Sequence, residues 1–192
     1  MAVDKFSNAA GPNTGLIKIV PTSIAVGSGS GSVDVNGTVT FSGSSSVSLN
    51  GCFTSLYRNY IIIYDSSTGG SGSGNTYFRL RQSGSDDTAS TYEYGVFSIY
   101  SAPGSGVNQY SGNNSIAELN QTFGPTQINM YSPQLAINTR WHFNAAVNYS
   151  TGGAGAQLGG GYKKDTKQYD GFTLVNGATT MSGAMFVYGF NQ

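Results

Sequence analysis

Charged residues are scarce in this sequence. Asp, Glu, Lys and Arg make up 9% of its 192 residues, about a third of the share that is usual in globular proteins. The nine acids balance the nine bases, so no net field attracts nucleic acid or an anionic membrane. Gly, Ser, Thr, Asn and Tyr take the places that charges normally occupy, and such a surface suits a protein that packs beside many copies of itself.

The chain has a single cysteine, Cys52, and a single histidine, His142. One thiol excludes an internal disulfide, and one Cys with one distant His cannot form the clustered ligand set that zinc requires. His142 would be the only base for a nucleophilic Ser or Cys. In "RWHFNAAV", however, it alternates with Trp141 and Phe143, as an ordinary strand residue would. We therefore expect no enzyme activity and no catalytic, metal-binding or cofactor-binding residues.

Long apolar segments are also missing. No run of about 18 apolar residues exists, so no segment is predicted to span a membrane. The opening residues, "MAVDKFSNAAGPNTG", lack the basic patch and apolar stretch of a secretory signal. We expect synthesis in a reducing host cytoplasm.

The few carboxylates and the glycine-rich segments suggest sites that the surrounding sequence does not support. Asp86, Asp87 and Glu93 could offer oxygen ligands to calcium, but no spaced calcium loop is present, and a solvated turn is the simpler interpretation. "SIAVGSGSGS" (23–32) is similar to a dinucleotide-binding loop, yet a hairpin follows it rather than a helix, which favours a linker or wide turn. A glycosidase would need two carboxylates about 5–10 Å apart in a cleft, and the sequence leaves that alternative open.

Apolar and polar residues alternate with a period of two over many short segments. The clearest is "SVDVNGTVTFSG" (32–43), where Asn36-Gly37 between alternating residues predicts a two-residue hairpin turn. No long segment keeps a helical period. About ten short strands between Gly, Ser and Asn turns predict an all-β fold, an antiparallel β-sandwich that is jelly-roll-like. The other predicted strands are 16–20, 47–49, 60–65, 76–84, 90–101, 114–122, 126–131, 135–149, 155–162, 171–175 and 183–190.

The stretch "NGCFTSLYRNYIIIYDSS" (50–67) contains the densest run of branched and aromatic residues. Residues 53–59 could form one helical turn with Phe53, Leu56 and Tyr57 on one face. Residues 60–65 have the β-branched density of a strand that is buried on both faces.

Tyrosine is abundant, with 13 residues. Its ring packs in cores and subunit interfaces, and it also stacks on sugars. The candidates for a core or subunit contact, or alternatively for glycan binding, are Tyr92, Tyr94, Tyr100 and Tyr110.

The N-terminal segment is polar and interrupted by Gly and Pro, so we predict an extended arm over residues 1–26 and a sandwich domain over residues 27–192. The arm is expected to anchor the protein to a larger assembly through its apolar residues. These are Phe6, Leu16, Ile17, Ile19 and Val20.

Three blocks in the same order resemble the small β-sandwich virion surface proteins of tailed bacteriophages, of the tail-fibre and capsid-decoration type. They are "VTFSGSSSVSLNGCFTSLYRNYIIIYD" (39–65), "YFRLRQSGSDDTASTYEYG" (77–95) and "YDGFTLVNGATTMSGAMFVYGFNQ" (169–192). The resemblance implies a sandwich displayed on the particle as a symmetric oligomer. It also implies that Cys52 lies at a turn before a strand, where it acts as a small apolar filler.

From these observations we expect a non-enzymatic virion surface protein that decorates and reinforces the particle. Its partners would be copies of itself, as a homo-oligomer and specifically a trimer, and phage capsid or tail proteins, without nucleic acid or membrane insertion. The chain has no collagen-like or heptad stalk, which favours a subunit that docks directly on the capsid or tail. The alternative is a tail-fibre tip that binds host surface glycan.

Overall fold

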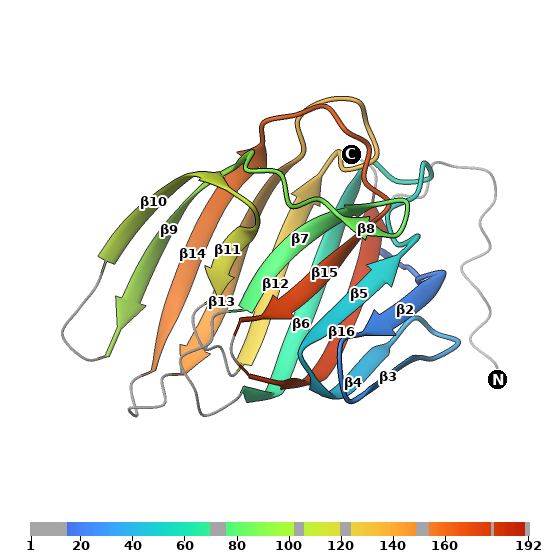
Figure 1. Cartoon of the computed structure of the whole chain (residues 1–192), viewed down its shortest axis with the longest axis horizontal. Coiled ribbons are helices and arrows are strands. Elements are labelled where there is room, and N and C mark those ends of the chain that lie inside the picture. Colours follow the sequence, from blue (N-terminus) through green and yellow to red (C-terminus); the bar gives the residue numbers. More distant parts are fainter. Residues whose placement is uncertain are drawn as a thin grey trace.

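The computed structural model of the chain describes residues 15–69, 76–101, 106–119, 124–148, 154–177 and 179–190. Two β-sheets lie face to face in it, and every strand pairing is antiparallel (Figure 1). The described residues contain no helix. The prediction of an all-β antiparallel sandwich is therefore confirmed.

The larger sheet, which we call sheet A, has ten strands in the order β10-β9-β14-β13-β12-β6-β16-β4-β3, with β1 paired to β16. Its strands are β1 (Ile17–Lys18), β3 (Ser30–Val33), β4 (Val39–Ser44), β6 (Asn59–Gly69), β9 (Tyr92–Tyr100), β10 (Gly106–Asn113), β12 (Gly124–Tyr131), β13 (Arg140–Asn148), β14 (Ala154–Lys163) and β16 (Met181–Phe190).

The smaller sheet, sheet B, has six strands in the order β11-β7-β15-β5-β2, with β8 paired to β7. Its strands are β2 (Ser23–Val26), β5 (Ser46–Asn50), β7 (Thr76–Gln82), β8 (Ser85–Asp86), β11 (Ile116–Leu119) and β15 (Gly171–Asn176). It lies over the inner face of sheet A from the middle to the β4–β3 end (Figure 1).

An aromatic layer joins the two sheets. Phe78 of β7 and Phe172 of β15 stack with ring centroids 4.7 Å apart. Phe53 lies 5.9 Å from Phe172 and 4.8 Å from Tyr60 of sheet A, so it links one sheet to the other. All four side chains are buried, and each contributes about 1.5–3 kcal/mol by leaving water.

The segment before β6 forms a turn and not a helix. Tyr57 N donates to Thr54 O at 3.5 Å, and residues 53–58 contain no helix. Cys52 precedes it and is completely buried, in agreement with its predicted role as an apolar filler. Burial raises the pKa of the Cys52 thiol, which keeps the sulfur protonated and unreactive.

Strand β6 has one buried face, not two. Tyr60, Ile62 and Tyr64 are buried, whereas Ile61 and Ile63 are half-buried. The prediction of burial on both faces was wrong because no described layer covers the outer face of sheet A. The sequence has three consecutive isoleucines here, so the alternation between buried and half-buried positions is not visible in it.

Glycine at position 159 of β14 makes room for Phe143 of β13. A Cβ at Gly159 would overlap the Phe143 ring, so the neighbouring strand can bring this buried aromatic side chain across β14 only if residue 159 has no side chain.

The predicted arm of residues 1–26 is partly incorporated into the sandwich. β1 pairs with β16, β2 pairs with β5, and Ile19 N donates to Val187 O at 2.8 Å. Ile19 is 8% exposed, so it is a core residue rather than a free contact, while Leu16, Ile17 and Val20 are exposed. Phe6 lies outside the described residues. The boundary at residue 26 is therefore too late in the chain.

Two segments for which no strand was predicted contain strands, and one of them, 23–32, was predicted as a linker or wide turn. Residues 23–32 form β2, a turn at 27–29 and the start of β3, and residues 106–113 form β10. Small polar residues weaken the sequence pattern of a strand in both segments. The strands form because β2 pairs with β5, β3 with β4 and β10 with β9.

The β3–β4 connection is longer than the predicted two-residue turn. Val33 pairs with Val39, and residues 34–38 form the loop between them. Asp34 Oδ1 accepts hydrogen bonds from Asn36 N at 2.9 Å and Thr38 N at 2.8 Å, which holds the longer loop. Gly37 has φ of 76° and lies against the Ile19 carbonyl.

We predict that Gly37→Ala destabilises the protein by more than the ~1–2 kcal/mol that a left-handed alanine costs, because its Cβ would also press on Ile19 O. Gly84→Ala is the matched control, since Gly84 has φ of 79° but open space around it. Urea unfolding of both variants measures the difference. Equal losses would contradict the Gly37–Ile19 contact.

Candidate functional site

The outer face of sheet A carries an exposed apolar patch near its β10 edge. Val107, Phe97 and Leu158 are aligned across β10, β9 and β14, and they are 69%, 41% and 52% exposed. Ile99, two residues along β9 on the same face, is 49% exposed. We call these four residues the β9–β14 patch. Contiguous exposed apolar side chains of this kind mark interaction surfaces.

The patch ends at an open sheet edge. β10 pairs with β9 on one side, and no described strand pairs with its other side. Its outward N–H and C=O groups are thus available to another chain.

Two of the four candidate tyrosines are core residues. Tyr92 and Tyr94 are 0% and 6% exposed, which agrees with the core contact predicted for them and not with the glycan-binding alternative. The Tyr92 hydroxyl accepts from Leu80 N at 3.1 Å and donates to Asp87 O at 2.9 Å, joining sheet A to sheet B. The side chains of Tyr100 and Tyr110 lie outside the described part of the structure.

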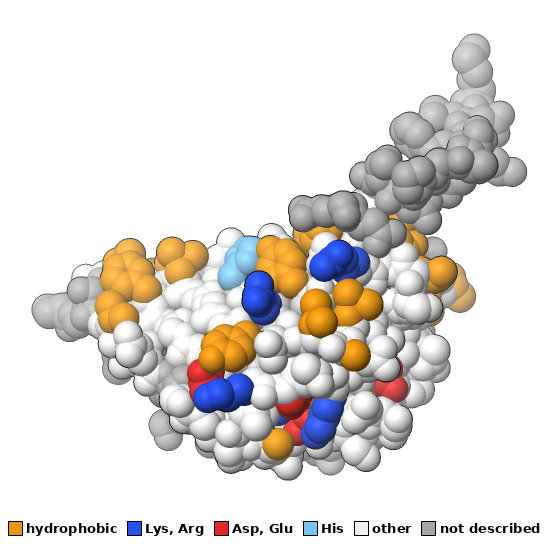
Figure 2. Space-filling model, turned by 90° about the horizontal axis from the view of Figure 1, so that it is seen from above, with side chains coloured by type: hydrophobic (Ala, Val, Ile, Leu, Met, Phe, Trp, Pro, Cys, Tyr) orange, Lys and Arg blue, Asp and Glu red, His pale blue; other side chains and the backbone are white. Residues whose placement is uncertain are grey.

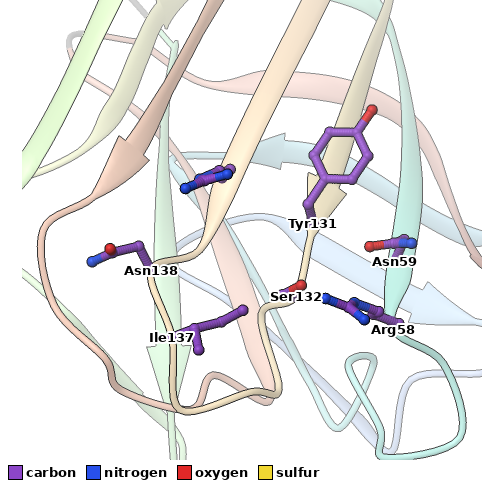
Figure 3. Close-up of a pocket in the computed structure, with 7 residues that line it drawn as sticks. Arg58, Asn59, Tyr131, Ser132, Ile137 and Asn138 are labelled. Atoms are coloured by element: carbon purple, nitrogen blue, oxygen red, sulfur yellow. The ribbon is translucent and has the colours of Figure 1, made fainter.

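A pocket of about 720 Å³ opens at one end of the sandwich, where β6 and β13 begin and β12 ends. Figure 3 shows that its walls come from the start of β6, the end of β12 and the loop that follows β12. The lining residues are Arg58, Asn59, Tyr131, Ser132, Ile137, Asn138 and Arg140.

The pocket is positively charged and mixes polar with apolar groups. Arg58 and Arg140 contribute two guanidinium groups, and no carboxylate lines the pocket. Tyr131 extends the surface toward His142, since its hydroxyl lies 3.1 Å from His142 Nδ1. Figure 2 views this end of the molecule, where basic side chains alternate with hydrophobic ones beside the single histidine. Such a site suits an anionic ligand with hydroxyl groups.

The loop after β12 is held in place by its own polar side chains. Asn138 Nδ2 donates to Lys163 O at 3.1 Å and to Asp165 O at 3.0 Å. Gln134 Nε2 donates to Phe53 O at 2.8 Å. The pocket is therefore built on fixed backbone.

A buried charged cluster lies behind this loop. The side chain of Lys163, the last residue of β14, is 0% exposed. Its Nζ lies 3.4 Å from Asp87 Oδ1, 3.3 Å from Asp165 Oδ2 and 3.9 Å from the centre of the Tyr92 ring. The Tyr169 hydroxyl lies 2.8 Å from Asp87 Oδ2 and 2.9 Å from Asp165 Oδ1.

The cluster shifts the pKa values of Asp87 and Tyr169, among others. Burial alone would raise the pKa of Asp87, but hydrogen bonds from Ala89 N, Lys167 and Tyr169 and the charge of Lys163 lower it to about 2. Burial and the two neighbouring carboxylates raise the pKa of Tyr169, so its hydroxyl keeps its proton.

The sequence analysis missed this cluster, although one signal was present. The segment Lys163–Asp170 contains five of the chain's 18 charged residues, the sum of nine acids and nine bases. The interpretation of Asp86 and Asp87 as a solvated turn was wrong, because Asp86 pairs with the buried Arg81 and Asp87 is 8% exposed. Their partners lie on other strands, which no local pattern reveals.

No group of three or more metal-ligating side chains occurs in the described ranges. Asp87 and Asp165, which lie close together, are closed in by Lys163 and Tyr169 rather than facing a cleft. Glu93 binds Lys164 Nζ at 2.8 Å and the Tyr162 hydroxyl at 2.6 Å. The geometry therefore offers no support for a glycosidase pair among these carboxylates.

Comparison of the chain with protein-family models, curated proteins and solved structures finds no match. None of the described segments forms a helix of the length and hydrophobicity that crossing a bilayer would require.

We predict that Tyr92→Phe lowers the free energy of unfolding by about 1–3 kcal/mol, because it leaves Leu80 N and Asp87 O without their buried partner. Tyr162→Phe is the control, since that hydroxyl binds Glu93 at the surface and its loss costs less than about 1 kcal/mol. Denaturant unfolding of both variants gives the two values. Losses of the same size would show that the Tyr92 bridge adds no stability.

Proposed function

We propose that the chain is a non-enzymatic structural protein of a tailed-phage virion, and that it forms a symmetric homo-oligomer, specifically a trimer, on the particle surface. The β9–β14 patch carries this proposal. Four apolar side chains, 41% to 69% exposed, lie together on one sheet face beside an open edge strand. In a chain with 9% charged residues, no dense ionic surface competes with this face for a partner.

A second copy is the partner that this surface fits best. β10 can extend its sheet by pairing with a strand of a neighbouring copy, and the aligned row from Val107 to Leu158 is then covered by that neighbour. The balanced charge adds no repulsion between copies. The blocks that resemble phage surface proteins support a particle as the place of assembly.

We expect Phe97→Asp combined with Leu158→Asp to convert the oligomer to a monomer, because two carboxylates would be buried in the contact. Sedimentation velocity measures the change, and circular dichroism checks that the sandwich is kept. Val35→Asp is the matched control, since Val35 is 90% exposed in the β3–β4 loop and outside the patch. A double variant that stays oligomeric would overturn the proposed contact.

Attachment to the particle is assigned to the N-terminal segment that precedes the sandwich. Deleting residues 1–14 leaves β1 and the Ile19 contact intact, unlike a deletion to residue 20. The truncated chain should fold and oligomerise but disappear from purified virions, as measured by quantitative mass spectrometry. Unchanged occupancy would remove the anchoring role from this segment.

The pocket at the end of the sandwich supports a second function, which is attachment to an acidic glycan on the host surface. Arg58 and Arg140 can bind a sugar carboxylate, and Tyr131 offers an aromatic ring and Asn59 an amide beside them. A fibre-tip protein and a decoration protein would both use such a site from the particle surface.

We predict that Arg140→Ala weakens binding of uronic-acid oligosaccharides at least about tenfold, since hydrogen bonds to a charged group contribute about 1.5–3 kcal/mol. Lys164→Ala removes a cation outside the pocket and should leave affinity unchanged. Calorimetric titration with acidic and neutral oligosaccharides provides the comparison. If the wild-type chain binds neither, the attachment function is excluded.

A further inference from the structure

Lys163 has the surroundings of a reactive amine rather than of a surface lysine. Its side chain is fully buried at the end of β14, and its Nζ contacts Thr91 Oγ1 and lies over the Tyr92 ring. Oxygen atoms of Asp87, Asp165 and Thr91 and the face of the Tyr92 ring lie around the nitrogen. Burial of this kind removes the water around the nitrogen, so a nitrogen that has passed a proton to a neighbour faces the adjacent carboxyl group directly.

Asp87 places its carboxyl group next to this nitrogen. Asp87 Oδ1 lies 3.4 Å from Lys163 Nζ, and the Asp87 side chain is 6% exposed. Ala89 N donates to Oδ1 at 3.0 Å, and Lys167 Nζ donates to Oδ2 at 2.9 Å. These bonds fix the carboxyl group and withdraw electron density from its carbon.

A second carboxylate and a hydroxyl group connect the two reactants through a chain of hydrogen-bonding atoms. Asp165 Oδ2 lies 3.3 Å from Lys163 Nζ and 3.0 Å from the Tyr169 hydroxyl. The same hydroxyl lies 2.8 Å from Asp87 Oδ2. A proton can thus pass from Lys163 to Asp165, and the Tyr169 hydroxyl can relay it to Asp87 by taking one proton as it gives another, so that the hydroxyl stays protonated throughout.

We propose that Lys163 and Asp87 condense to form an intramolecular amide cross-link, with Asp165 and Tyr169 as the groups that move the proton. After Lys163 gives one proton to Asp165, its neutral nitrogen forms a bond to Asp87 Cγ, and the bond from Cγ to Oδ2 breaks. Two protons of the ammonium group leave with that oxygen as one water molecule. The step is neither oxidation nor reduction and needs no further reactant.

Asp87 is the acceptor because of its position in the chain. Asp165 is only two residues from Lys163, so an amide between these two would close a short loop within one segment and would not join the two sheets. Asp87 follows β8 and is tied to sheet B by its N–H, which donates to Leu80 O at 2.8 Å. The cross-link therefore joins β14 of sheet A to sheet B and closes a long loop of chain.

Such a bond has a clear physical use in a chain without a disulfide. A covalent link restricts the unfolded chain and stabilises the fold without requiring an oxidising compartment. It also replaces a buried ion pair, whose two desolvated charges add little net stability.

Mass spectrometry of the purified full-length chain, unfolded before injection, tests the proposal. We expect an intact mass lower than the sequence mass by one water molecule, after allowance for the initial methionine. A tryptic map should contain one branched peptide that joins Asp87 to Lys163, with no cleavage after Lys163. An intact mass equal to the sequence mass, or a water loss that maps to another pair, would overturn it.

A variant and its control test whether Asp165 accepts the proton when the cross-link forms. Asp165→Asn keeps the shape of the proton acceptor but not its basicity, so most of that chain should retain the full sequence mass. Lys164→Arg is the matched control on the exposed neighbour and should still lose water. If the Asp165→Asn chain cross-links completely, Asp165 is not the proton acceptor. The peptide map of the wild-type chain shows whether the cross-link exists, even if a variant does not fold.

Discussion

Phe53 packs between Tyr60 of sheet A and the stacked Phe78 and Phe172 of sheet B, and the positions of the other features follow from this aromatic layer. Once these rings are buried, the alternation along each strand fixes which side chains face inward and which face out. The inner face of sheet A then holds Tyr92, while its outer face is left to present the β9–β14 patch. The loop after β12 is tied to the same layer, because Gln134 bonds to the Phe53 carbonyl, and this places the pocket.

Scarce charge does not mean that charge is unimportant here. Arg81 is 9% exposed and bonds to Ser48, Thr173 and Asp86, while Lys163 is fully buried between two carboxylates. The chain therefore buries several of its few ions in paired clusters, with Lys163 between the sheets and Arg81 among the strands of sheet B. Loss of one partner would leave an unpaired buried charge. The surface is left neutral and rich in hydroxyl and amide groups, which is the composition expected for close association with other copies.

Local pattern predicts much of this fold. Strands over 126–131, 171–175 and 183–190 agree closely with β12, β15 and β16, since each has strong alternation between turn residues. β10 was not predicted because "GVNQYSGN" has little hydrophobic signal, and its strand forms by pairing with β9. The pocket and the Lys163 cluster could not be predicted for a different reason. Arg58 and Arg140, like Asp87 and Lys163, are brought together only by the order of strands in the sheets, which no spacing in the sequence specifies.

Cryo-electron microscopy of intact virions tests the central claim most directly, since it shows where the chain lies and which face is covered. The account predicts multiple copies on the particle surface, with the outer face of sheet A at Phe97 and Leu158 buried against a neighbouring copy. Particles that lack the chain, or that carry isolated copies with this face in solvent, would contradict it.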